Sequence, residues 1–265
     1  MTPEAENSRR IQAVRTSCTL IEALAELDRA GPTELADRVG VSKTTAYHHL
    51  STLEETGFVV REDGQFSLSL RFLDVGGGLR DKIDIYSAGE EELQALAMET
   101  GEYVNLVIEE RGVGYIVEKC RGSQSATTSS HIGQSVPLHS TGAGKAILAR
   151  LPEERVDAIL STYEFEERTS ETLTSESALR RELETVRDRG YAVLTGEHFE
   201  GAGAVAAPVR HRATGVQAAV SVTGPLSWLL DGQSGNKYDR VSPELADQVV
   251  DTANRIEMRL DMSAE

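Results

Sequence analysis

The sequence predicts an α+β protein in two parts, a small N-terminal part of three helices and a β-hairpin and a larger part in which helices pack on an antiparallel sheet. Three observations support this prediction. The chain has 265 residues, enough for one large domain or two modest ones. Apolar residues recur with a helical period before residue 56. After residue 100, strand-like runs adjoin through short glycine-bearing turns, which favours an antiparallel sheet over a doubly wound parallel one.

The chain begins with an amphipathic helix predicted from Arg10 to Arg29. Its apolar residues recur at spacings of three or four and indicate one buried face, made of Ile11, Val14, Cys18, Ile21, Leu24 and Leu27. Ala30-Gly31-Pro32 ends this helix. Thr33 is then expected to cap a short second helix, which stops at the turn around Gly40.

A third helix is expected from Ser42, its N-cap, to about Glu55, with Gly57 just past its end. Its apolar residues Ala46, Leu50 and Leu53 share one face and are expected to pack on the first two helices. The apolar runs 58–60 and 66–68 flank Glu62-Asp63-Gly64, which is a hairpin signal. This order of elements is typical of a winged helix-turn-helix.

Polar side chains gather in the N-terminal half of the third helix, the half that enters the major groove in this motif. Hydroxyl groups suit phosphates and base edges, threonine methyls suit thymine methyls, and a lysine at the helix start suits a phosphate. With an arginine beside the hairpin, the candidate DNA-binding residues are Ser42, Lys43, Thr44, Thr45, Tyr47, His48, Ser51 and Arg61. The alternative is an ordinary polar surface helix.

The second part reads as mixed α/β. A glycine-bearing helix is expected to lead into it, because Gly76-Gly77-Gly78 interrupts an apolar series of helical spacing. Further helices are predicted at 87–100, 142–151, 153–161, 176–189 and 242–260. Strands are predicted at 103–109, 113–119, 191–195, 204–209 and 217–222.

Five motifs in order resemble the IclR-type transcriptional regulators. They are TELADRVGVSKTTAYHHLSTLEETGFV (33–59), SVPLHSTGAGKAILA (135–149), RGYAV (189–193), VAAPV (205–209) and VSVTGP (220–225). The resemblance implies a winged helix-turn-helix DNA-binding domain at 1–70, a linker or dimerisation helix at 71–86 and a GAF-like effector-binding domain at 87–265. It also implies homodimers or dimers of dimers on double-stranded DNA, at a two-fold-related operator whose affinity a small-molecule effector controls.

The resemblance also implies an effector site, carried over motif by motif. Its residues are Val136, Gly142, Ala143, Leu194, Ala204, Ser221 and Thr223. Leu194 stands where carboxylate-sensing members often have Asp, and Ala204 where they often have Cys. Both exchanges remove polar groups and argue against a small keto acid. A larger or more apolar ligand and a neutral sugar derivative using Ser221 and Thr223 remain open.

Other readings of the 139–145 run are weaker. A P-loop would need Gly at 139 and Ser or Thr at 146, where the chain has His139 and Ala146. The run instead resembles a helix start capped by Ser140 or Thr141, with free N–H groups that suit an anion. We expect no catalytic residues, no metal site and no cofactor, since no convergent acid–base or ligand set is present. The rival hypotheses are a small-molecule-binding or a catalytic α/β protein whose N-terminal helices are a protein-interaction module.

Charge is the unusual feature of the composition. The chain has 43 acidic and 27 basic residues, for a net charge of −16, and its basic residues are 22 Arg and only 5 Lys. This balance favours adaptation to molar salt, where a Debye length of about 3 Å weakens repulsion between surface carboxylates. An ordinary acidic protein is the alternative. Residues 31–61 carry three basic and four acidic side chains, so the candidate DNA-binding surface is near neutral.

The remaining composition predicts a cytoplasmic protein with no membrane partner. No apolar stretch approaches the roughly 18 to 20 residues that a transmembrane helix needs, and the N-terminus has no apolar core of a secretory signal. The two cysteines, Cys18 and Cys120, exclude a disulfide scaffold. So few cysteines indicate a protein of a reducing compartment. His48-His49 and Trp228 have no role that the sequence decides.

Overall fold

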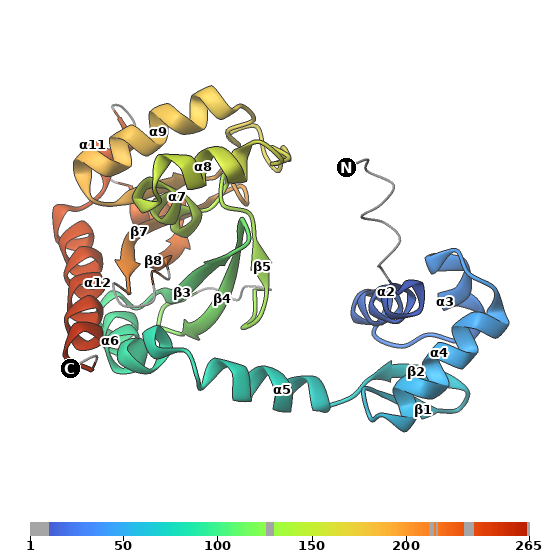
Figure 1. Cartoon of the computed structure of the whole chain (residues 1–265). Coiled ribbons are helices and arrows are strands. Elements are labelled where there is room, and N and C mark those ends of the chain that lie inside the picture. The colour runs from blue at the N-terminus through green and yellow to red at the C-terminus, as the bar shows by residue number, and fades with distance from the viewer. Residues whose placement is uncertain (1–10, 126–129, 212–214, 216, 231–235, 264–265) are drawn as a thin grey trace. The chain divides into compact units, whose positions relative to one another are not determined.

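A computed structural model gives the three-dimensional structure of the chain (Figure 1). It describes residues 11–125, 130–211, 215, 217–230 and 236–263, so Arg10, the expected start of the first helix, lies outside the described residues. The chain divides between Leu79 and Arg80 into two compact units. Each unit has its own hydrophobic core, and each is described by itself.

The first unit contains the predicted three helices and hairpin. They are α2 (Gln12–Leu27), α3 (Pro32–Val39), α4 (Lys43–Glu55), β1 (Val59–Glu62) and β2 (Gln65–Leu68). The two strands pair antiparallel, and Asp63 and Gly64 between them both have positive φ, 51° and 80°. Positive φ at both central residues is what a type I′ turn requires, so the Asp-Gly pair sets this hairpin.

The helix ends of this unit confirm two predicted caps and correct a third. Ser42 caps α4, because its hydroxyl accepts a hydrogen bond from the Thr45 N–H at 3.0 Å. Gly57 follows the end of α4 with a φ of 81°. The predicted cap Thr33 is wrong: the N-cap is Gly31, two residues earlier, and α3 begins at Pro32. Proline suits this first helical position because a backbone N–H there would have no acceptor within the helix, so the N–H that proline lacks is not needed.

The core of the first unit is built from all three helices and the hairpin. Leu20, Leu24, Leu35, Leu50 and Phe66 are fully buried. Ala46, Leu50 and Leu53 of α4 are buried on the predicted face. The prediction for α2 is wrong in its first half. Ile11, Val14 and Cys18 are exposed, and the helix instead buries Thr16 and Leu20.

The glycine-bearing segment forms α5 (Arg71–Arg80), which starts where the sequence predicts but stops before the expected residue 86. The backbone turns extended at Ile83, with φ −90° and ψ 106°, and α6 (Asp84–Thr100) starts after it. Ile83 and Tyr86 therefore belong to the second unit, where they pack on its core. The predicted helix at 87–100 is the rest of α6.

The second unit is organised around one antiparallel sheet in the order β5-β4-β3-β8-β7-β6. Its strands are β3 (Tyr103–Glu110), β4 (Val113–Cys120), β5 (Ser135–Val136), β6 (Ala192–Thr195), β7 (Ala202–Arg210) and β8 (Gln217–Pro225). The predicted antiparallel sheet is thus confirmed. The two-residue strand β5 was not predicted, because two residues carry no detectable period.

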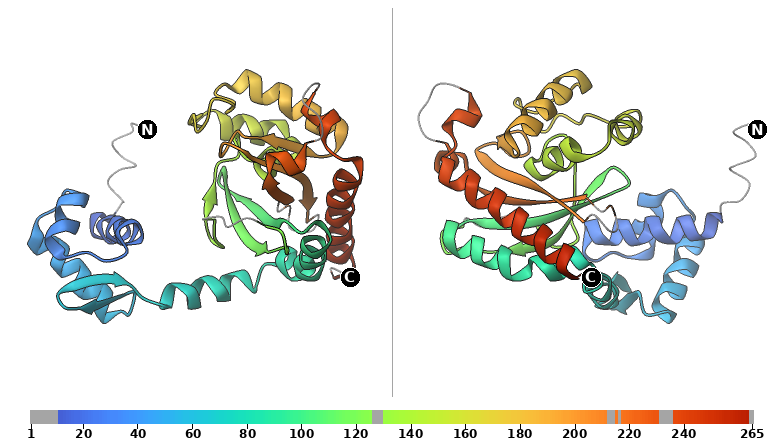
Figure 2. Two further views of the ribbon diagram at one scale, coloured as in Figure 1. Left: turned by 180° about the vertical axis from the view of Figure 1, so that it is seen from behind. Right: turned by 60° about the vertical axis from the view of Figure 1, so that its left-hand side comes forward.

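Helices cover both faces of this sheet, as Figures 1 and 2 show. They are α7 (Gly142–Arg150), α8 (Glu153–Leu160), α9 (Glu176–Arg189), α10 (Leu226–Leu229), α11 (Lys237–Arg240) and α12 (Pro243–Ser263). α6 and α12 lie together on one face, and α7, α8 and α9 lie on the other. Gly89 of α6 permits the close contact with α12, since a Cβ there would lie 3.2 Å from Ile256. The predicted α+β architecture is confirmed.

Within the part of the chain that the structure describes, no helix has the length and apolar character needed to span a membrane.

Candidate functional site

The eight candidate DNA-binding residues lie together on the first unit. These residues are Ser42, Lys43, Thr44, Thr45, Tyr47, His48, Ser51 and Arg61. Thr45 and Ser51 are half-buried, and the other six side chains are exposed. All but Ser42 and Arg61 belong to α4, and Ser42 is the cap of that helix. The buried face of α4 fixes the helix on the core, so its polar face points to solvent. This is the geometry that reading a DNA groove requires.

Arg61 connects the hairpin to α4. Its Nη1 donates a hydrogen bond to the hydroxyl of Tyr47 at 3.3 Å, and its guanidinium carbon lies 5.6 Å from the centre of the Tyr47 ring. The same guanidinium lies over the ring of Phe66, in the core of the unit, at 5.4 Å. The sequence predicted both residues for this surface but not their contact.

The two adjacent histidines, His48 and His49, have different surroundings. His48 is exposed and its ring meets Tyr47 edge-on, with ring centres 6.4 Å apart. His49 is half-buried and its Nδ1 lies 2.8 Å from the hydroxyl of Ser17 on α2. His49 therefore ties α4 to α2. Among the residues that the structure describes, no group of three His, Cys, Asp or Glu side chains is placed to hold a metal ion.

The second unit contains a cavity of about 450 Å³ between α7 and the sheet. All seven residues carried over from the family resemblance line it: Val136, Gly142, Ala143, Leu194, Ala204, Ser221 and Thr223. They come from β5, α7, β6, β7 and β8, which span almost ninety residues of sequence. Aliphatic side chains form much of the wall, with Val107 and Ile116 beside the predicted residues.

The N-terminus of α7 forms one wall of this cavity. Thr141 is its cap, with its hydroxyl accepting from the Gly144 N–H at 3.1 Å, so Thr141 rather than Ser140 has the capping role. Gly142 faces the sheet, where a Cβ would lie 3.4 Å from Ala204. At Gly144 a Cβ would lie 2.3 Å from the Cα of Leu138. The second glycine therefore allows α7 to approach the segment before it.

A buried charge network lies behind α7. The Nζ of Lys145, which is fully buried, donates to both carboxylate oxygens of Glu197 at 2.8 Å and to the carbonyl of Val193 at 3.3 Å. Lys237 pairs with the same Glu197 at 3.2 Å and with Glu182 at 2.7 Å. Burial, together with the charge of Lys237, lowers the pKa of Lys145 to about 8 against the attraction of the carboxylates. The network fixes the 196–198 turn beside the cavity.

Several polar residues that line the cavity were not found from the sequence. Three of them, Glu102, Asn105 and His198, bear on its chemistry. His198 hydrogen-bonds through Nδ1 with the Ser140 hydroxyl at 3.3 Å, and burial lowers the pKa of His198 to about 4, so the ring is neutral at pH 7. Glu102 follows a helix end and Asn105 lies within an apolar strand, positions with no sequence signal for a site.

Burial also distinguishes Glu102. Its side chain is almost fully enclosed, and desolvation raises the pKa of its carboxyl group above the ordinary value. Among the described residues, no partner lies within hydrogen-bond distance of Glu102 Oε2 or of Asn105 Oδ1. Both oxygens are therefore free to accept a hydrogen bond from a molecule in the cavity.

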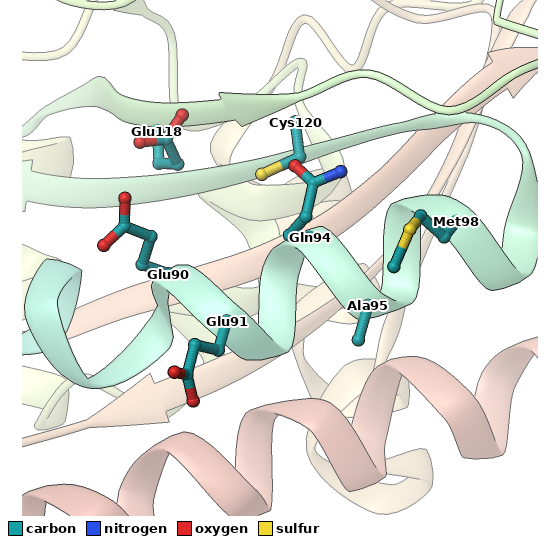
Figure 3. A pocket seen from close by; sticks show the side chains of 7 residues that line it. All are labelled: Glu90, Glu91, Gln94, Ala95, Met98, Glu118 and Cys120. Atoms are coloured by element: carbon teal, nitrogen blue, oxygen red, sulfur yellow. The ribbon is translucent and has the colours of Figure 1, made fainter.

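A second hollow, of about 420 Å³, lies beside α6 and β4 (Figure 3). Glu90 points toward Glu118 and Gln94 lies beside Cys120. Glu90 accepts a hydrogen bond from the Tyr86 hydroxyl, and Glu118 pairs with Arg80 at 3.5 Å. Burial, with these carboxylates nearby, raises the pKa of the Cys120 thiol to about 11, so it stays protonated at neutral pH. Trp228 packs on the core and is not among the lining residues of either hollow.

Comparison with known proteins relates both units to one family. Residues 17–63 match the IclR helix-turn-helix domain, and residues 79–257 match the bacterial transcriptional regulator IclR C-terminal domain. The chain is 35% identical over 268 residues to the probable HTH-type transcriptional regulator ArcR of Halobacterium salinarum, covering 98% of this chain and 99% of that protein. It is 30% identical over 227 residues to the transcriptional repressor IclR of Escherichia coli, covering 84% and 83%.

A solved structure agrees. The crystal structure of the Thermotoga maritima IclR superposes with a TM-score of 0.70 at 28% identity, covering 94% of this chain and 97% of that one. Both domain matches, the relatives and the fold identify the same architecture, a helix-turn-helix domain for DNA followed by an effector-binding domain. The chain therefore belongs to the IclR family of transcriptional regulators.

Proposed function

We propose that this regulator binds a two-fold-related operator through α4 and the β1–β2 wing, and that a small effector in the 450 Å³ cavity controls its affinity for that operator. One observation carries this proposal furthest. Seven residues named from separate sequence motifs gather around one cavity, with both hydrogen-bonding and apolar groups on its walls. A concave, mostly apolar site with a few polar groups is what a small-molecule ligand requires.

The DNA-binding role is proposed for the eight residues on and beside α4. Their support is the combination of a buried face that fixes the helix and an exposed face rich in hydroxyl groups. In this proposal Lys43, at the helix start, contacts a phosphate, and Thr45 and Tyr47 contact base edges. The contact with Tyr47 holds Arg61 at the hairpin side of the same surface.

We propose that the protein acts as a homodimer, or as a dimer of dimers. α5 has no buried residue, and its apolar side chains Leu73, Val75 and Leu79 are 72%, 55% and 66% exposed. Ile11 and Val14 of α2 are also more than half exposed. Several large apolar side chains exposed along one short helix support a protein interface at α5. A second copy of the chain is the partner that two half-sites require.

The finer assignments belong to the same proposal. The DNA-binding domain comprises residues 1–70, the linker helix residues 71–86 and the effector domain residues 87–265. The protein regulates rather than catalyses, in the cytoplasm, and at molar salt. The acidic composition, with its scarcity of lysine, supports the last point.

The test is selection of genomic DNA fragments by the purified protein in about 2 M KCl, with low salt alongside, since salt governs the phosphate contribution to binding. We expect enrichment of fragments that share a two-fold-related motif. Thr45→Ala and Tyr47→Ala should each weaken binding to that motif by about 1–3 kcal/mol. Thr19→Ala, at an exposed threonine of α2, is the control and should change little. Equal losses in all three variants, or no enrichment at either salt, would refute the DNA-binding role.

A further inference from the structure

Glu102 and Asn105 form a polar end of the effector cavity whose chemistry differs from that of its other walls. We propose that this end binds a protonated amine group of the effector, with the aliphatic wall holding a short apolar body. The inference rests on the proposed function, because it takes the cavity to be an effector site. It assigns the ligand class that the seven residues found from the sequence leave open.

Packing directs the Glu102 carboxylate onto the sheet. The residue follows Gly101, which ends α6 with a φ of 75°, and its carbonyl accepts from the Gly122 N–H at 3.1 Å. The carboxylate lies over Gly224 of β8, where a Cβ would be 2.9 Å from Cδ and 3.0 Å from Oε2 of Glu102. Gly224 therefore leaves the space that the carboxylate occupies. A side chain at that position would displace it from this end of the cavity.

Asn105 lies on β3, three residues after Glu102, and lines the same cavity. It pairs in register with Ser221, and its Nδ2 donates to the Thr223 hydroxyl at 3.5 Å. The amide donor is thus directed toward β8, and Oδ1 is left as an acceptor. Glu102 is 3% exposed and Asn105 8%, so a buried acceptor without a partner carries an energetic penalty that a bound donor would remove.

The formal charges around the cavity favour a cation. Glu102 and Glu200 are the charged residues of the described lining, and neither Lys nor Arg is among them. His198 is neutral at pH 7. Lys119 stands outside the lining, over the ring of Tyr103, and donates to the Ser130 carbonyl and hydroxyl. A carboxylate ligand at the Glu102 end would therefore meet like charge, whereas an ammonium group would pair with the buried carboxylate.

The experiment uses the full-length protein and three probes of one size: n-butylammonium, n-butanol and butyrate at equal ionic strength. Dissociation constants come from ligand-observed NMR titrations. We expect butylammonium to bind at least tenfold more tightly than either of the other probes. Glu102→Gln, which keeps the shape and removes the charge, should abolish this preference. Asn105→Leu should weaken butylammonium binding severalfold. Glu154→Gln, at an exposed glutamate of α8, is the matched control and should leave all three constants unchanged.

Several results would overturn the inference. Butyrate binding most tightly would assign the cavity to anions, and butanol binding as tightly as butylammonium would assign it to neutral hydroxyl donors. No binding of any probe, or equal effects of Glu102→Gln and Glu154→Gln, would also reject the amine site. Should Glu102→Gln fail to fold, Asn105→Leu decides alone. DNA binding by the Thr45 and Tyr47 variants is measured separately, so loss of the amine site leaves the regulator role standing.

Discussion

Lys145 lies at the centre of the buried charge network behind α7, and its charge holds that helix to the turn carrying Glu197. Removing one member of such a network leaves the other charges buried without their full set of partners. Lys145→Met should therefore destabilise the second unit by about 3 kcal/mol, the lower end for a broken buried pair because Lys237 still contacts Glu197. Denaturant unfolding monitored by circular dichroism measures the change.

The control for this substitution is a surface pair. Arg168→Met removes the exposed Arg168–Glu166 contact and should cost less than about 1 kcal/mol. The double variant Lys145→Met/Glu197→Gln should recover part of the loss, since it also removes a buried negative charge that has lost one of its two cationic partners. Equal unfolding midpoints for Lys145→Met and Arg168→Met would show that the network contributes nothing to stability.

His198 makes the stability of the second unit depend on pH. Burial depresses its folded pKa to about 4, below the value near 6.5 of an unfolded chain, so the unfolded state binds more protons between these two values. Stability is therefore retained above pH 6.5 and falls as the pH drops toward 4. From pH 7 to pH 5 these two pKa values imply a loss of about 2 kcal/mol from this one ring.

His198→Asn should accordingly lose less stability than the wild type between pH 7 and pH 5, as measured by urea unfolding at each pH. His131→Asn, at an exposed histidine, is the comparison and should follow the wild-type curve. A His198→Asn curve parallel to the wild type would mean that the ring titrates normally in the folded protein.

Helix α5 contains three consecutive glycines, which disfavour a helix, and is also the proposed dimer interface. Apart from the neighbouring residues and the backbone of α5 itself, no atom of the described chain lies within 4 Å of a Cβ placed at Gly76, Gly77 or Gly78. Each of these glycines costs the helix about 1 kcal/mol relative to alanine. Close approach of a second copy along α5 would offset this cost, and the exposed Leu73 and Leu79 would be buried there.

Leu73→Glu should weaken self-association at least tenfold in sedimentation equilibrium and reduce operator affinity in parallel, because the proposed dimer would contact both half-sites. Met258→Glu, at a similarly exposed residue of α12, is the control and should leave both unchanged. Gly77→Ala separates two explanations. If α5 lies at a close interface, the added methyl group should weaken association. If α5 lies in solvent, alanine should raise the unfolding midpoint and leave association unaffected.

At the scale of the whole molecule, acidity shapes the expected DNA binding. The net charge is −16, and around α4 basic and acidic side chains nearly balance, with Arg38 already paired to Glu26. Few phosphate contacts mean little release of counterions. We therefore expect operator affinity to change little between about 0.5 and 2 M KCl, whereas a protein with several phosphate contacts loses affinity steeply as salt rises.

Fluorescence anisotropy with a labelled operator across this range of KCl tests the expectation. Thr44→Arg, which adds a positive charge to the exposed polar face of α4, is a useful comparison. Its salt dependence should be steeper than that of the wild type when the added charge meets a phosphate. A steep fall in wild-type affinity between 0.5 and 2 M KCl would count against adaptation to molar salt.

The sequence by itself determined the elements and the polar face of α4. Local periodicity predicted each long helix, the paired strands and the cap at Ser42, because these features depend on residues within a few positions of one another. Local patterns failed where tertiary packing overrides them. The apolar residues Ile11 and Val14 of α2 resemble a core face but are exposed, and α5 stops at Arg80.

The character of the cavity depends on contacts between distant parts of the chain. The family motifs named seven of its residues, but Glu102, Asn105 and His198 carry no motif, and chain folding brings them to the same space. Asn105 and Thr223 lie 118 positions apart and meet because β3 pairs with β8. Whether a carboxylate or amide oxygen is partnered depends on such long-range pairing and on burial. A sequence pattern records only neighbours along the chain, so it shows neither the long-range pairing nor the burial of these oxygens.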